Sequence, residues 1–450
     1  MRHRLLGGLA CLLATAFSPA AAPAFAQEGR VIDSVTGAGI AAATISDGAR
    51  VTQTDATGHF SLSGPLTGPA GRLMARAPGY RAGAATEAEL DARDGTIRLR
   101  RFQPHALYLS AYGIGAPTLR ENALAVVRAG AANALVIDIK GDRGLIPYPS
   151  AIPLAQQDGA REMTTIPDLA ALVASLHAEG VYAIARIVVF KDEPLAEARP
   201  DLAVHLGNGA VFRDRKGMPW TDPFQPEVRD YNIAVAVEAA RAGFDEIQFD
   251  YVRFPDCPER LRFAGVPTQA TRLQAIAALL TEARRRLLPY NVYLAADVFG
   301  YVCWNFDDVG IGQRLEEIMP LVDYLSPMLY PSGFQYGIPG YKNPVTHAYE
   351  IVRQSLDRAR ERVGVAPERF RPWLQAFKDY AFDRRPFGPD EVATQIRAAT
   401  DFGTDGWMLW NPRNDYRGTG LPGAEAAWMP EHAAPLPAAV SASPSSSSCS

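Results

Sequence analysis

Residues 246–255 read EIQFDYVRFP, and this stretch predicts a buried β-strand whose two faces differ in chemistry. Side chains alternate across a strand, so Ile247 and Phe249 point to one face, while Gln248 and Asp250 point to the other. The apolar face suits contact with a layer of helices. The polar face suits the inside of a barrel of parallel strands, where a carboxylate near a strand end meets side chains of neighbouring strands. This strand therefore indicates an α/β fold with helices on the outside.

The same alternation of a buried strand and an amphipathic helix recurs over residues 105–425. The predicted strands cover residues 106–111, 134–140, 182–190, 246–252, 292–298, 323–329, 371–377 and 406–410. The predicted helices between them cover residues 119–129, 166–179, 227–242, 270–288, 312–319, 348–363 and 391–402. This order predicts parallel βαβ units, and eight such units close into a (β/α)8 TIM barrel. A doubly wound open sheet is the main alternative. Its nucleotide-binding form is disfavoured, because no G-x-G-x-x-G loop follows the first strand.

Residues 27–101 carry a different pattern, with short alternating runs separated by glycine and aspartate turn residues. The runs lie at residues 30–33, 43–45, 51–54, 59–62, 73–77 and 96–99. They predict a small all-β sandwich. The stretches GRVIDSVTGAGIAAATI at 29–45, TDATGHFSL at 54–62 and APGY at 77–80 together resemble the carboxypeptidase-regulatory-like domain. This resemblance implies an accessory module that acts as a spacer or docking unit and supplies no catalytic residue.

Residues 1–26 have the features of a secretory signal peptide. A basic start precedes an apolar run at residues 5–17, and Ala24-Phe25-Ala26 supplies small residues for cleavage before Gln27. The apolar run is too short to span a bilayer comfortably. We therefore expect a cleaved signal and a periplasmic or secreted protein without stable membrane insertion.

The composition is that of a globular protein. Of the 450 residues, 48% are hydrophobic and 21% are charged, which suits a chain that buries a large core. The formal net charge of -4 argues against nucleic acid as a partner, because nucleic-acid binders usually present a basic face. Residues 433–450 are rich in alanine, proline and serine and predict a disordered tail.

Sorting the strand residues by face gathers polar side chains at the carboxyl ends of the strands, where the active sites of TIM barrels lie. These side chains are Asp138, Lys140, Arg186, Asp250, Asp297 and Gln375. Burying so many polar groups costs free energy unless they pair with one another or serve chemistry. For Asp138, Lys140 and Arg186, a structural ion network and a role in substrate binding are both open. For Asp250 and Asp297 we favour a catalytic role.

Two carboxyl groups on adjacent strands suit glycoside hydrolysis, which needs a pair of carboxyl groups on either side of one bond. We predict Asp250 as the nucleophile, because Lys140, Arg186 or Arg253 can keep it ionised, and Asp297 as the acid. Loop carboxylates are alternatives to Asp297, namely Asp192, Glu193, Asp256 and Asp307. Aromatic rings at strand ends can stack on sugar faces. The predicted substrate-binding residues are Asp138, Lys140, Arg186, Arg253, Trp304, Tyr330 and Gln375.

Two of the four cysteines follow the strands that carry these carboxylates. Cys257 lies seven residues after Asp250, and Cys303 lies six residues after Asp297. If the strands are neighbours, both cysteines sit on adjacent loops above the site, and export permits them to pair. We therefore predict a disulfide between Cys257 and Cys303, which would hold the two loops in a fixed relation.

The predicted barrel resembles a known family of glycoside hydrolase-like domains, DUF4015. The stretches that carry the resemblance are DIKGDRG at 138–144, FDYVRFP at 249–255, LSPMLYPSGF at 325–334 and WMLWNP at 407–412. The family is similar to the α-amylase-related barrels, which implies a nucleophile at the end of the fourth strand and an acid at the end of the fifth. By position these are Asp250 and Asp297. The fifth-strand acid of such enzymes is usually glutamate, so Asp297 departs from that pattern.

Two other classes of function are open. A non-catalytic polysaccharide-binding protein of the cell envelope would use the same ring-lined cleft, with carboxylates that only bind hydroxyls. A metal-dependent hydrolase would need histidines at strand ends, and the sequence has no H-x-H or H-E-x-x-H pair. We therefore predict no metal, no cofactor, and a polysaccharide or oligosaccharide as the partner.

Overall fold

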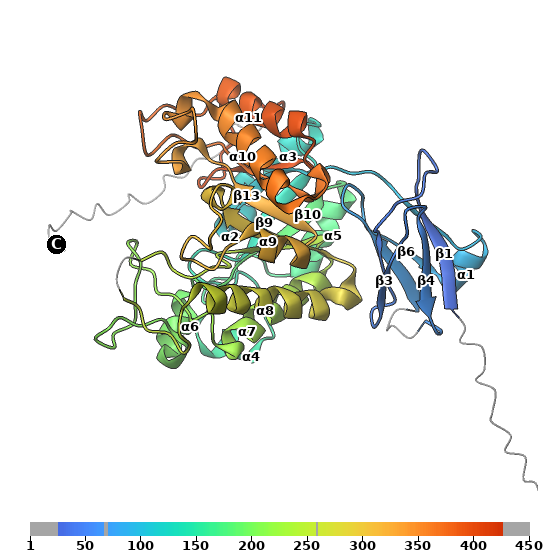
Figure 1. Ribbon diagram of the computed structural model, residues 1–450, viewed down its shortest axis with the longest axis horizontal. Helices are drawn as coiled ribbons and strands as arrows, with labels where there is room; N and C mark the ends of the chain where they lie inside the picture. The colour runs from blue at the N-terminus through green and yellow to red at the C-terminus, as the bar shows by residue number, and fades with distance from the viewer. Residues whose placement is uncertain (1–25, 67–70, 258–259, 426–450) are drawn as a thin grey trace, which may run out of the picture.

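The computed structural model describes residues 26–66, 71–257 and 260–425 (Figure 1). The larger unit is a closed barrel of eight parallel strands in chain order, which confirms the TIM-barrel prediction. The strands are β8 (His105–Leu109), β9 (Ala134–Lys140), β10 (Tyr182–Val188), β11 (Glu246–Asp250), β12 (Tyr293–Phe299), β13 (Tyr324–Met328), β14 (Trp373–Gln375) and β15 (Trp407–Trp410). Each corresponds to a predicted strand, although β14 is shorter than expected.

Helices surround the barrel, as Figure 1 shows. The seven predicted helices correspond to α3 (Pro117–Arg128), α5 (Leu169–Ala178), α7 (Pro226–Ala242), α8 (Gln269–Leu287), α9 (Leu315–Ile318), α10 (Ala348–Val363) and α11 (Pro389–Phe402). Three short helices were not expected: α2 (Ala111–Gly115), α4 (Pro153–Gln157) and α6 (Glu193–Ala198). Their few residues do not complete two turns, so no helical periodicity can be read from the sequence.

The barrel separates its side chains into two layers, as the alternation in residues 246–255 predicts. Ile247 and Phe249 lie in the apolar core between strands and helices. Gln248 points inward and donates a hydrogen bond to Ser326 Oγ at 3.2 Å, across the inside of the barrel. The inside is otherwise filled mainly by apolar and aromatic side chains from seven of the strands. The barrel is therefore a packed core whose polar groups gather at its ends.

The N-terminal unit consists of two small sheets around one apolar core, which confirms the predicted sandwich. One sheet contains β1 (Ala26–Asp33), β4 (His59–Ser63) and β7 (Thr96–Leu99). The other contains β2 (Thr44–Ser46), β3 (Val51–Gln53), β5 (Arg72–Arg76) and β6 (Gly83–Thr86), and α1 (Glu87–Asp91) follows. Strand β6 was not expected, because Gly-Ala-Ala-Thr is poor in strand-forming residues. The likeness to carboxypeptidase-regulatory-like domains remains a prediction.

The sandwich contacts the amino-terminal ends of the barrel strands. Tyr293, the first residue of β12, donates its hydroxyl to the carbonyls of Ala77 and Tyr80 at 3.0 and 2.7 Å. Arg76 pairs with Asp323 just before β13, with 3.4 Å between Nε and Oδ2. These contacts lie at the end of the barrel opposite the predicted site. The carboxyl ends of the strands therefore stay open for a ligand.

The predicted signal peptide up to residue 25 and the predicted tail at 433–450 lie outside the described residues. Within the described ranges, no helix combines the length and apolar character that crossing a membrane requires.

Candidate active site

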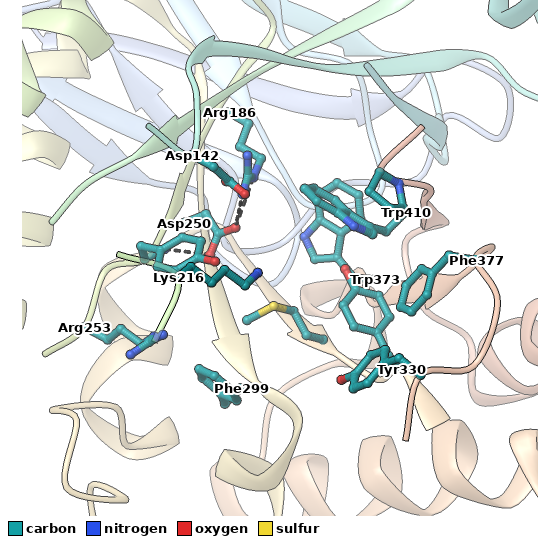
Figure 2. A pocket seen from close by; sticks show the side chains of 14 residues that line it. Asp142, Arg186, Lys216, Asp250, Arg253, Phe299, Tyr330, Trp373, Phe377 and Trp410 are labelled. Atoms are coloured by element: carbon teal, nitrogen blue, oxygen red, sulfur yellow. Dashed lines mark hydrogen bonds and ion pairs between the residues drawn. The ribbon is translucent and has the colours of Figure 1, made fainter. Parts of the chain in front are cut away.

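A cavity of about 390 Å³ opens at the carboxyl ends of the barrel strands. It is lined by Asp142, Arg186, Lys216, Asp250, Tyr251, Arg253, Phe299, Met328, Tyr330, Trp373, Phe377, Tyr380, Trp410 and Pro412. Figure 2 shows that its walls differ: the charged side chains gather on one side, whereas Tyr330, Trp373, Phe377 and Trp410 form the other. A ligand held between them contacts charged groups on one face and flat rings on the opposite face.

Arg186 on β10 organises the charged wall. Its guanidinium donates Nη1 to Asp138 Oδ1 at 2.6 Å and Nη2 to Asp142 Oδ1 at 2.9 Å. Nε and Nη2 both reach Asp250 Oδ2, at 3.0 and 2.5 Å. Arg186 is 1% exposed, so these charge-assisted bonds form away from water, where they are strong. One arginine therefore fixes three carboxylates at the ends of β9 and β11.

Asp250 sits at the last position of β11 and lines the cavity. The next residue, Tyr251, has φ of 50°, a conformation that is costly for a residue other than glycine. This turn brings the Tyr251 backbone N–H to 2.6 Å from Asp250 Oδ1. Asp250 thus receives hydrogen bonds on both oxygens while its carboxylate faces the cavity.

Asp297 on β12 lies completely buried and is not among the residues that line the cavity. Its Oδ1 accepts a hydrogen bond from Trp373 Nε1 at 2.8 Å, and its Oδ2 has no partner among the described residues. Burial raises the pKa of Asp297 well above its usual range, the charge of Asp250 adds to the rise, and Arg186 opposes it. Asp297 therefore holds a proton at pH values where an ordinary aspartate is ionised.

The two carboxylates on the other side of Arg186 differ from each other. Burial raises the pKa of Asp138 to about 6, although Arg186 acts in the opposite direction. Asp138 Oδ2 also accepts a hydrogen bond from the Tyr108 hydroxyl at 2.6 Å. For Asp142, burial raises the pKa, but Arg186 and then Lys191 outweigh burial and leave the pKa below its usual value.

Asp142 lines the cavity but is not among the predicted site residues. It lies in the loop two residues after β9, and the prediction sorted only residues within strands by face. The stretch DIKGDRG at 138–144 contains it and could have drawn attention to it. Lys216, Phe299, Phe377 and Tyr380 are further cavity residues that lie outside the predicted set. Most of them come from loops, whose path the sequence pattern does not give.

Three of the predicted substrate-binding residues lie away from the cavity. Lys140 pairs with Asp192 at 2.7 Å between Nζ and Oδ2, and both side chains are fully buried. Trp304 donates its Nε1 to Ser355 on α10 at 2.9 Å. Gln375 is fully buried and donates to Ser332 Oγ at 2.7 Å, which supports the loop after β13. By contrast Arg186, Arg253 and Tyr330 line the cavity, and Asp138 lines an adjoining one.

The proposed alternatives to Asp297 also lie elsewhere. None of the loop carboxylates Asp192, Glu193, Asp256 and Asp307 lines the cavity. Asp192 is the N-cap of α6, where its Oδ1 accepts from the Leu195 N–H, and its other oxygen meets Lys140. Glu193 pairs with Arg143. These contacts explain the presence of both carboxylates by structure alone.

The predicted disulfide between Cys257 and Cys303 is wrong, because both thiols are free in the structure. Cys303 ends the 3-10 helix η3 (Gly300–Cys303), which packs against α10, and its side chain is buried in the apolar core. Cys257 lies only at the edge of that core. The adjacent strands thus send their cysteines to different environments, which spacing alone does not reveal.

Alkylation of the unreduced native protein should therefore modify Cys257 and leave Cys303 untouched until the chain unfolds. Burial raises the pKa of Cys303 to about 12, so this thiol is both shielded and unreactive at neutral pH. Mass spectrometry of iodoacetamide-treated protein, with and without guanidinium chloride, gives the measurement. A cross-linked Cys257–Cys303 peptide would contradict this expectation.

Within the described ranges, no group of three or more histidine, cysteine, aspartate and glutamate side chains is arranged to hold a metal ion.

The sequence matches a known protein family over the barrel. The sequence model of the family DUF4015, described as "Putative glycosyl hydrolase domain", matches residues 106–416, which is the barrel. No curated protein matches the chain.

Solved structures similar to this chain include glycoside hydrolases. A hypothetical protein from Ruminiclostridium thermocellum shares 34% identity over 43% of this chain and 97% of its own, with a TM-score of 0.37. The glycoside hydrolase domain of PgaB (BpsB) from Bordetella bronchiseptica shares 16% identity over 72% of this chain and 97% of its own, with a TM-score of 0.52. A beta-galactosidase from the psychrophilic Marinomonas ef1 shares 12% identity over 72% and 59%, with a TM-score of 0.51. Identities as low as the last two establish a common fold.

Proposed function

The chain belongs to the DUF4015 family, and from this membership we propose that it hydrolyses glycosidic bonds in a polysaccharide or oligosaccharide, with Asp250 as the reacting carboxylate. In this proposal Asp250 attacks the anomeric carbon or activates a water molecule, and a second carboxyl group protonates the leaving oxygen. A non-catalytic glycan-binding role would use the same cavity without bond cleavage.

The observation that carries the proposal is the pair of carboxyl groups in unlike surroundings at the ends of β11 and β12. Asp250 faces the cavity and accepts charge-assisted hydrogen bonds from Arg186 Nε and Nη2, which hold its carboxyl group in place. Asp297 is completely buried on the adjacent strand, and burial together with the charge of Asp250 raises its pKa. Two neighbouring carboxyl groups in different environments can supply the base or nucleophile and the acid of such a reaction.

The aromatic wall supports a sugar as the ligand. Trp373 and Trp410 stand nearly perpendicular, with 5.5 Å between ring centroids and 82° between ring planes. Tyr330 and Phe377 continue this wall with centroids 5.4 Å apart (Figure 2). Cavities that bind organic ligands combine such apolar surfaces with a few polar groups that fix orientation. Here the polar groups are the carboxylates that the reaction needs.

Replacement of Asp297 by asparagine should slow the cleavage of natural glycans by about 10²- to 10⁴-fold, the usual contribution of a general acid. The same variant should cleave aryl glycosides with a dinitrophenolate leaving group almost normally, because that leaving group needs no proton. The wild-type rate should fall as pH rises through the raised pKa of Asp297, and the variant should lack this fall. Release of reducing ends and of dinitrophenolate gives the two rates.

Asp142→Asn is the matched comparison, because Asp142 is the other carboxylate that lines the cavity beside Asp250. Its pKa is lowered, so it is ionised and poorly suited to donate a proton. If Asp142→Asn, and not Asp297→Asn, shows the dependence on leaving group, then Asp142 is the acid and the assignment of Asp297 falls. If wild-type protein cleaves no glycan and no aryl glycoside, the proposed hydrolysis itself falls.

A further inference from the structure

Arg253 is a buried cation in the wall of the cavity. The side chain is 9% exposed, and its guanidinium makes one hydrogen bond, from Nη1 to the Phe254 carbonyl at 2.9 Å. Among the described residues it forms no ion pair. A guanidinium carries five N–H donors, so most of the donor capacity of Arg253 stays unused at the edge of the cavity.

Three aromatic rings hold this guanidinium in place. Its Cζ lies 4.8 Å from the centroid of Trp220, 5.2 Å from that of Tyr251 and 4.8 Å from that of Phe299. These cation–π contacts offset part of the cost of burying the charge and restrict the side chain to one position. Burial still lowers the pKa of Arg253, with Tyr251 and Asp250 opposing that shift. The charge is thus fixed in place but incompletely compensated.

Arg186, in the same cavity, differs from Arg253 because its hydrogen-bond donors are paired with carboxylates. Its guanidinium is bonded to three carboxylates, and it has little left to offer a ligand. Lys216 resembles Arg253 in this respect, because its exposed side chain lines the cavity and forms no ion pair in the described part of the chain. The cavity lining therefore contains three cations and two carboxylates, and neither Arg253 nor Lys216 forms an ion pair with a described residue.

We propose that the sugar unit bound in this cavity is acidic, and that Arg253, assisted by Lys216, binds its carboxylate. This inference rests on the proposed glycoside hydrolysis and names the class of substrate, a glycan that contains uronic acid residues. A planar guanidinium pairs with a carboxylate through two parallel hydrogen bonds, a geometry that hydroxyl groups do not reproduce. The same cavity holds Asp250, so the acidic unit lies next to the bond that is cleaved. A sulfate ester on a neutral sugar has related chemistry and is the competing source of the charge.

The test compares oligosaccharides of galacturonic, glucuronic and mannuronic acid with the same oligosaccharides after reduction of their carboxyl groups to alcohols. Wild-type kcat/KM should be at least about tenfold higher for one acidic series than for its neutral counterpart, because only the acidic series can accept charge-assisted hydrogen bonds from Arg253. Arg253→Gln should remove most of this preference, because it should lower kcat/KM for the acidic series by a much larger factor than for the neutral series. Lys216→Gln, a substitution at an exposed position, should reduce the preference by a smaller factor and raise KM more than it lowers kcat.

Two further variants keep the test informative if Arg253→Gln folds poorly. Arg253→Lys keeps the positive charge but loses the planar fork, and it should retain only part of the preference. Arg213→Gln is the control, because Arg213 is exposed, lies near Lys216 in the chain, pairs with Glu197 and does not line the cavity. It should leave both series unaffected.

The outcomes separate this inference from the proposed function. Cleavage of neutral glycans at rates equal to or above those of the acidic ones would overturn the acidic substrate and leave glycoside hydrolysis standing. Cleavage of sulfated glycans together with failure on every uronate would overturn the carboxylate assignment in favour of a sulfate ester. Failure of the wild-type protein on all of these substrates would overturn the hydrolysis on which the inference rests.

Discussion

Asp250→Asn should abolish glycan hydrolysis, lowering kcat/KM by about 10⁴-fold or more, the scale seen when a residue of a catalytic unit is removed. Asparagine has nearly the same shape as aspartate, but it cannot act as a nucleophile or as a base. The variant should still bind the glycan, because the aromatic wall formed by Tyr330, Trp373, Phe377 and Trp410 is unchanged. Reducing-end assays measure the loss of hydrolysis, and isothermal titration calorimetry measures the retained binding.

Glu246→Gln on the same strand is the matched control. Glu246 is the first residue of β11, and Asp250 is the last. Like Asp250, Glu246 pairs with a buried arginine: Arg371 Nη1 lies 2.5 Å from Glu246 Oε2. Both substitutions remove one buried charge from an arginine contact, so both should lower the melting temperature. Only Asp250→Asn should remove activity per folded molecule. Equal activities of the two variants would show that Asp250 takes no part in the reaction and would favour a protein that only binds glycans.

The strand pattern predicts the barrel well because its physical cause is local. Each barrel strand has one face against the helices and one face inward. Because successive side chains point to opposite faces, the position of a residue in the strand predicts which face it lies on. The inward positions of Asp138, Arg186, Asp250 and Asp297 follow from this alternation and are found in the structure. The large apolar clusters on the two sides of the strands reflect the same rule.

The alternation fails where the strand ends are irregular. The pairing of β9 with β10 shifts between Arg186 and Ile187, so that Lys140 lies opposite Ile187. The Lys140 ammonium then reaches Asp192 and the Val188 carbonyl, at 2.7 Å each, and turns away from the cavity. A bulge of this kind depends on tertiary contacts and leaves no clear sign in a single sequence.

Loop residues are the second group that the pattern could not place. Trp304 and Cys303 follow β12 closely, yet η3 directs both toward α10 and the apolar core. Asp142 follows β9 by two residues and instead meets Arg186 at the cavity wall. Spacing from a strand end says that a residue is near the site, but the path of the loop decides whether its side chain faces the ligand.

Arg186→Met should cost about 3–5 kcal/mol of stability at neutral pH, the range for removing one partner from a buried ion pair. The substitution leaves Asp138, Asp142 and Asp250 without their common counter-charge in a site where Arg186 is fully enclosed. Activity should fall as well, because Asp250 loses the two hydrogen bonds from Arg186 that orient it. Thermal unfolding and kcat/KM of the purified variant measure the two effects.

The loss of stability should depend on pH in a defined direction. In the native protein the pKa of Asp138 is already raised from 3.8 to about 6, so its proton stabilises the fold below about pH 4, and this contribution is lost as pH rises to about 6. Without Arg186 the pKa values of Asp138 and Asp142 should both rise, because Arg186 is the counter-charge that lowers them in the native protein. The stability difference between wild type and Arg186→Met should therefore be small near pH 4 and grow toward pH 7. A difference that stays constant with pH would contradict this electrostatic explanation.

Arg371→Met separates the structural effect of Arg186 from its effect on the reaction. Arg371 is an equally buried arginine at the opposite end of the barrel, where it pairs with Glu246 at 2.5 Å and Asp405 at 2.9 Å. Loss of its charge should destabilise the barrel to a similar extent but leave kcat/KM per folded molecule unchanged. If both arginine variants lose activity in proportion to stability, Arg186 supports only the fold. If Arg186→Met alone loses activity, Arg186 positions Asp250 for the reaction.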